Sequence, residues 1–134
     1  MHSLEFTIPL EPRTKKNSSQ ILKNKKTGKM FVSTSKQFKE YQDKCGYFLP
    51  RIPRPIDCKI NIKAIYYMGT RRTVDITNLH SALHDILQHY RVIAGDDMKI
   101  VISTDGSRVR YDKANPRTEV TITEVFEVTG FEKS

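Results

Sequence analysis

The stretch Ile56-Asp57-Cys58-Lys59-Ile60-Asn61-Ile62-Lys63-Ala64-Ile65-Tyr66-Tyr67 decides the fold class of this chain. Apolar residues stand at every second position as far as Ala64, with polar residues between them, and this period of two predicts a strand with one buried face. The period then changes, because apolar side chains recur at helical spacing over residues 77–90, as Leu79, Ala82, Leu83, Ile86, Leu87 and Tyr90. A strand followed by an amphipathic helix predicts a sheet with helices packed on it.

The flanking segments predict further strands and a second helix. Strands are expected over 4–10, 29–33, 99–104, 108–111 and 119–128, the last with Val120 and Ile122 on one face. Thr34 and Gln37 have the spacing of a capping box, which places the start of the other helix at Thr34. This order predicts one α+β (α/β) domain over residues 1–134, a mixed β-sheet with helices packed on it.

The charge of the chain favours polyanionic partners. Its 134 residues contain 23 Lys and Arg against 15 Asp and Glu, a formal net charge of +8. Such an excess is typical of proteins that bind nucleic acid or acidic lipid. Residues 13–29 contain basic residues and no acidic one, and we expect them to form a long cationic loop or hairpin.

Cysteine content and hydropathy indicate the compartment. Cys45 and Cys58 are too few for a disulfide scaffold or a zinc ribbon, and we expect both thiols to be reduced. The first residues lack the pattern of a signal peptide, and no apolar segment is long enough to span a bilayer. These features predict a soluble cytoplasmic protein with no membrane partner.

Carboxylates gather at the two ends of the helix predicted over 77–90. Asp75 precedes it, and Asp96 and Asp97 follow it. Mg²⁺ prefers a few hard oxygen ligands, so converging carboxylates could hold one against a phosphate. If the strands before and after the helix are neighbours, the loop with Asp96 and Asp97 can return beside Asp75. The structural alternatives are a helix cap for Asp75 and a turn for Gly95-Asp96-Asp97.

Three other polar residues of this helix have structural explanations. His80 and His84 are four apart and could ligate zinc, but no third ligand has a recognisable spacing. We place them opposite Leu79 and Leu83, on a solvated helix face. Asp85 could reach the acidic site or pair with a nearby cation, and we favour the pairing.

Basic residues accompany the acidic ones. Arg71 and Arg72 stand just before Asp75, where they could clamp a scissile strand and neutralise charge near the metal, or simply lie in an exposed loop. The segment Lys15-Lys16-Asn17 could follow a phosphate backbone electrostatically.

Several motifs together resemble the RusA family of Holliday junction resolvases, over nearly the whole chain. The resemblance rests on Phe6-Thr7-Ile8-Pro9 before a basic loop, the run Arg71-Arg72-Thr73-Val74-Asp75-Ile76-Thr77-Asn78-Leu79, the segments Asp85-Ile86-Leu87 and Gly95-Asp96-Asp97-Met98-Lys99-Ile100-Val101, and the closing Glu119-Val120-Thr121-Ile122-Thr123-Glu124. Each motif is short, but their order and spacing agree with the family.

The resemblance implies a small homodimeric endonuclease, often of prophage origin, that resolves four-way DNA junctions in recombination and repair by paired nicks. It implies Mg²⁺ as the cofactor, with Mn²⁺ as the alternative ion. It gives Asp75, Asn78 and Asp97 catalytic roles and makes Asp75, Asp97, Asp96 and Thr77 the metal-binding set. Lys15, Lys16, Asn17, Arg71 and Arg72 are the expected DNA-binding residues.

Two residues depart from the family pattern. Thr77 stands where the motif commonly has a second Asp, so this chain is a D-x-T-N variant with one anionic ligand fewer. Ser81 stands where an important Lys is found, which removes a cation near the phosphate. The alternative functions are therefore a non-catalytic junction-binding module with the same fold, and a related nuclease for flaps or other branched DNA.

Overall fold

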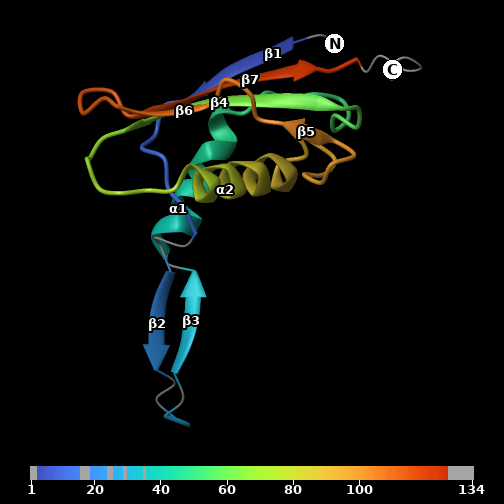
Figure 1. Cartoon of the computed structure of the whole chain (residues 1–134). Coiled ribbons are helices and arrows are strands. Elements are labelled where there is room, and N and C mark those ends of the chain that lie inside the picture. Colours follow the sequence, from blue (N-terminus) through green and yellow to red (C-terminus); the bar gives the residue numbers. More distant parts are fainter. Residues whose placement is uncertain (1–2, 16–18, 24–25, 29, 35, 127–134) are drawn as a thin grey trace, which may run out of the picture.

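The computed structural model describes residues 3–15, 19–23, 26–28, 30–34 and 36–126, with backbone alone for 19–23 and 30–34 (Figure 1). The elements in chain order are the strands β1 (Ser3–Ile8), β2 (Ser19–Lys23) and β3 (Met30–Thr34), the helix α1 (Lys36–Cys45), the short 3-10 helix η1 (Gly46–Phe48), β4 (Ile60–Met68), α2 (Ile76–His89), β5 (Val101–Ser103), β6 (Arg108–Tyr111) and β7 (Arg117–Glu124).

The main sheet is mixed, as the sequence predicts. Its order is β1-β7-β4-β5, and β6 also pairs with β4. β7 is antiparallel to both β1 and β4, whereas β5 and β6 are parallel to β4. β5 meets β4 at Ile60 and Asn61, and β6 meets it farther along, from Ile65 to Met68. The described residues thus form an α+β fold with a five-stranded sheet and two α-helices.

Two predicted strands begin later than their sequence patterns suggested. Ile56 forms only an isolated parallel bridge to Ile93, and β4 starts at Ile60. The Ile56 N–H donates to the Val92 carbonyl and the Ile56 carbonyl accepts the Ala94 N–H, so Ile56 pairs with the segment after α2 and not with β5 or β7. β5 starts at Val101 because the Asp97 carbonyl accepts hydrogen bonds from the N–H groups of Ile100 and Val101, which makes 97–101 a turn.

The cationic segment forms a hairpin in its described part. β2 and β3 pair antiparallel from Ser19↔Thr34 to Lys23↔Met30. Figure 1 shows this hairpin standing away from the sheet, beyond α1. Thr34 ends β3 and α1 begins at Lys36, so the predicted capping side chain lies outside the residues whose side chains are described.

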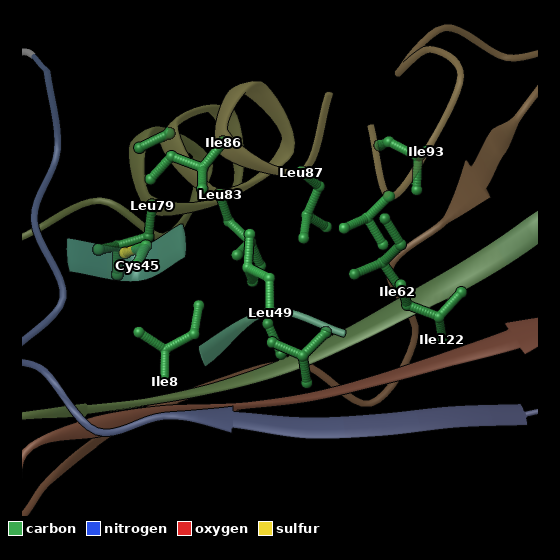
Figure 2. Close-up of a cluster of buried hydrophobic side chains, with 14 of the residues drawn as sticks. Ile8, Cys45, Leu49, Ile62, Leu79, Leu83, Ile86, Leu87, Ile93 and Ile122 are labelled. Carbon is green, nitrogen blue, oxygen red and sulfur yellow. The ribbon is translucent and has the colours of Figure 1, made fainter. Parts of the chain in front are cut away.

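The core lies between one face of the sheet and the two helices. Alternate residues of β4 and β7 are buried on this face, and Figure 2 shows side chains of α2 directed toward them. The apolar stripe predicted for residues 77–90 supplies Leu79, Ala82, Leu83, Ile86 and Leu87 from α2, and the buried residues of α1 add Phe38, Tyr41 and Cys45. Burying each large apolar side chain contributes about 1.5–3 kcal/mol, which fixes α2 against the sheet.

A glycine lets the end of α1 approach the end of α2. A Cβ added to Gly46 would lie 2.6 Å from Cε1 of the Tyr90 ring. The Tyr90 hydroxyl donates a hydrogen bond of 2.8 Å to the Gln42 carbonyl of α1. Tyr90 is therefore in close contact with the C-terminal part of α1, and only a residue without a side chain fits at 46.

Candidate functional site

Asp75 stands at the N-cap position of α2 with a carboxylate that does not cap the helix. Its backbone is extended, with φ −89° and ψ 129°, and its carbonyl accepts the N–H groups of Asn78 and Leu79, each at 3.1 Å. No hydrogen bond joins its side chain to the N–H groups of the first turn. The Asn78 amide reaches the carboxylate at 3.4 Å. Asp75 is exposed, so its carboxylate is available to a ligand.

Thr77 and Asn78 lie in the first turn of α2, close to Asp75 along the chain. Thr77 is exposed and Asn78 is half-buried. The three residues keep the order of the predicted motif at a helix N-terminus, where the free N–H groups and the helix dipole favour negative charge.

The other predicted acidic residues lie in a turn, as their structural alternative proposed. The Asp97 carboxylate accepts a hydrogen bond from the Lys99 N–H at 2.9 Å, and its carbonyl accepts the N–H of Ile100 at 3.0 Å. Asp96 and Asp97 are both exposed. This turn directs the chain into β5.

Within one chain, Asp97 does not return beside Asp75, and that expectation was wrong. The strands on either side of α2 are indeed neighbours, but they are parallel. A parallel crossover returns the chain to the end of the sheet from which it started. Asp75 therefore follows the Met68 end of β4, whereas Asp97 leads into β5 at the Ile60 end, about 26 Å away along a strand of this length.

The length of α2 also indicates that Asp75 and Asp97 lie apart within one chain. α2, which runs along the sheet in Figure 1, has 14 residues and a length of about 21 Å; Asp75 precedes it in the chain and Asp97 follows it. In the described part of the chain no three His, Cys, Asp or Glu side chains are grouped so that they could hold a metal ion. Within a single chain, the predicted set Asp75, Asp97, Asp96 and Thr77 is thus divided between the two ends of α2.

The arginine pair lies in the loop that leads from β4 to Asp75. Arg71 and Arg72 are exposed, and the guanidinium of Arg71 lies 3.9 Å from the centre of the Tyr111 ring. The loop is fixed where it begins, because the Glu11 carboxylate accepts the Gly69 N–H at 3.2 Å and Asp112 N–H donates to the Met68 carbonyl. Neither Glu11 nor Tyr111 belongs to a motif that indicates this role, so neither was among the predicted site residues.

Asp85 pairs with a cation, as expected. Its carboxylate lies 2.9 Å from Lys15 Nζ, so the predicted DNA-binding Lys15 is tied to α2. Both side chains are substantially exposed, and such pairs contribute about 1 kcal/mol or less. The other two predicted residues of that segment, Lys16 and Asn17, lie outside the described residues.

The prediction that His80 and His84 face solvent was wrong. His84 is only 8% exposed, and its buried Nε2 has no hydrogen-bond partner among the residues that the structure describes. His80 is half-buried; its Nδ1 is 2.7 Å from the hydroxyl of the buried Tyr66, and its ring stacks on that of His84. Tyr66 lies on the core face of β4, so the buried face of α2 is wider than its aliphatic stripe.

Burial determines the protonation of both histidines. It lowers the pKa of His80, and it lowers the pKa of His84 to about 4, with the neighbouring His80 acting in the same direction. Asp96 and Asp85 act in the opposite direction on His84, but more weakly. His84 is therefore neutral at physiological pH.

Both cysteines are free in the structure, with Cys45 buried and Cys58 half-buried. Neither helix of the described chain has the length and apolar character needed to cross a lipid bilayer. Comparison of the chain with protein-family models gave no match, and comparison with curated proteins gave none either.

Proposed function

We propose that this protein is a metal-dependent, structure-selective endodeoxyribonuclease that nicks branched DNA, with the four-way junction as its substrate and Mg²⁺ as its cofactor. The observation that supports this best is the Asp75 carboxylate, which is free of capping, exposed at the N-terminus of α2 and preceded by two exposed arginines. The ordered motifs that resemble the RusA family, and the net charge of +8, support the same proposal.

The separation of Asp75 and Asp97 adds a condition to this proposal. A site that uses both carboxylates must take them from two chains, since one chain holds them at opposite ends of α2. Homodimerisation then serves two purposes: it completes each site, and it provides two sites for a two-fold symmetric junction.

The separation of Asp75 and Asp97 also favours one alternative function, a non-catalytic junction-binding module. If each chain acts alone, its acidic residues stay apart, and Thr77 leaves the Asp75 end with one carboxylate fewer than the family motif. The protein would then bind junctions through its basic residues without cutting them.

A nicking and binding assay on two variants tests the proposal. A labelled four-way junction is incubated with the wild type, Asp75→Asn and Asp97→Asn, with Mg²⁺ or Mn²⁺, and binding is measured separately without a divalent ion. We expect nicks from the wild type, no nicks from either variant, and junction affinity in both variants at least equal to that of the wild type, because each substitution removes a negative charge from a basic protein.

Two results would contradict the proposal. A wild-type protein that binds the junction but leaves it intact with either ion would identify a binding module. A variant that cuts at the wild-type rate would remove its residue from the site. Asp105→Asn is the matched control, because Asp105 lies in the described turn before β6, outside the predicted site, and its loss should leave nicking unchanged.

A further inference from the structure

A groove of about 360 Å³ lies between residues 70–74 and β6. Arg71, Arg72, Val74 and Tyr111 are among its lining residues, and none of the described residues that line it is acidic. Nor does either arginine form an ion pair within the described part of the chain. Arg117, by contrast, has two carboxylate partners, Asp112 and Glu119. Two adjacent arginines without a counter-ion favour an anionic ligand in the groove.

Tyr111 holds one of these arginines in place. Its ring lies 3.9 Å from the Arg71 guanidinium carbon and remains 40% exposed. Stacking occupies a face of the guanidinium, whereas its N–H donors lie in the guanidinium plane and stay available to a phosphate. Tyr111 itself is fixed, because it pairs with Met68 in the parallel register of β4 and β6.

The groove leads directly to the candidate site. Val74 lines it and is followed by Asp75 at the N-terminus of α2. The lining of the groove thus extends along the chain from Arg71 to the residue before Asp75, so a DNA strand bound in the groove would lead toward the candidate site.

We propose that this groove is a subsite for a backbone phosphate of the bound DNA strand, with Arg71 as its main ligand and Tyr111 as the positioning residue that orients Arg71. This inference rests on the proposed function, since it assigns the groove to the same substrate. It gives Tyr111 a role that no sequence motif indicated.

A double-mutant cycle tests the subsite. The affinity for a fluorescein-labelled four-way junction is measured by anisotropy, without divalent ions, for Arg71→Gln, Tyr111→Leu, Tyr111→Phe and the double variant Arg71→Gln/Tyr111→Leu. We expect Arg71→Gln to weaken binding roughly ten-fold, as for a lost charge-assisted contact. Tyr111→Leu should weaken it several-fold, and Tyr111→Phe, which keeps the ring, should bind like the wild type.

The cycle distinguishes positioning from direct contact. If Tyr111 acts through Arg71, Tyr111→Leu causes no further loss in the Arg71→Gln background. A full additional loss there would overturn the positioning role, because the ring would then contact DNA itself. The salt dependence gives a second readout: Arg71→Gln should lower the slope of log affinity against log salt by about one phosphate contact.

Arg54→Gln is the matched control. Arg54 is exposed and precedes Ile56 near the start of β4, whereas the groove lies at Met68, the last residue of β4. Its loss changes the net charge equally and should weaken binding much less. If the wild type binds the junction and Arg71→Gln binds no worse than Arg54→Gln, the subsite is wrong while the proposed function stands. A wild type that binds no junction would overturn both.

Discussion

His84 is the residue whose burial differs most from what the sequence pattern predicts. At 100° per residue it lies 100° from Leu83 around the helix, outside the aliphatic stripe. It is nevertheless buried, because the stacked His80 and the hydroxyl of Tyr66 extend the covered face of α2. Sequence periodicity locates the centre of a buried face well, but its width depends on the neighbouring strand.

The burial of His84 predicts a pH-dependent loss of stability. The pKa of His84 is about 4 in the folded chain, against 6.5 for an unperturbed imidazole, so between these values the unfolded chain binds more protons. The free energy of unfolding should therefore fall as the pH drops from about 6.5 to about 4, by about 3 kcal/mol in total. Urea unfolding at closely spaced pH values measures this fall.

His84→Leu is the comparison, since leucine is apolar and does not titrate. The difference in unfolding free energy between wild type and variant should change across this pH range and be constant above it. A difference that is constant throughout would mean that the imidazole is protonated at no cost, in contradiction to its burial.

At the scale of elements, the contact between the ends of α1 and α2 depends on Gly46. A methyl group there would lie 2.6 Å from Cε1 and 2.7 Å from Cζ of the Tyr90 ring, so the ring or the helix end must move. We expect Gly46→Ala to lower the free energy of unfolding by about 1–3 kcal/mol, the usual range for overpacking. Chemical denaturation measures it.

Gly95→Ala is the control, because residue 95 has room for an added Cβ. An added Cβ at Gly95 would meet only Ile100 Cγ1, at 3.9 Å, which is ordinary van der Waals contact. Its effect should be small and can be stabilising, since alanine restricts the unfolded chain. Equal losses of unfolding free energy in Gly46→Ala and Gly95→Ala would show that the contact with Tyr90 does not exclude a side chain at residue 46.

The elements themselves could be predicted from the sequence far better than their pairing. The alternation from Ile60 to Tyr66 and the spacing of Leu79 and Leu83 predicted β4 and α2 closely. Strand direction has no such local signal, because it depends on contacts between distant segments. For this reason the residues of the candidate site could be chosen from motifs, whereas their separation within one chain could not.

At the scale of the whole molecule, the separation of Asp75 and Asp97 makes the source of each carboxylate testable. Asp75→Asn and Asp97→Asn chains carrying different tags are co-expressed, and the mixed dimer is isolated through both tags. If each site combines Asp75 of one chain with Asp97 of the other, the mixed dimer has one intact site and one doubly substituted site. We expect it to make single nicks in a four-way junction, although each variant alone makes none.

The result differs if each chain supplies a whole site. Both sites of the mixed dimer would then carry one substitution, and the junction would stay intact. The mixed dimer of Asp75→Asn chains with two tags is the control and should be inactive in either case. A protein that is monomeric by light scattering, both free and bound to DNA, would exclude the shared site directly.

The place of β7 in the sheet has a consequence for biosynthesis. Among the strands of the described residues β7 comes last in the sequence, yet it lies between β1, which comes first, and β4. During translation β1 emerges early and has no partner strand until residues 117–124 have left the ribosome. The sheet therefore closes only after residues 117–124 have been made, and a chain truncated before Arg117 retains β1 as an unpaired edge, which is prone to aggregate.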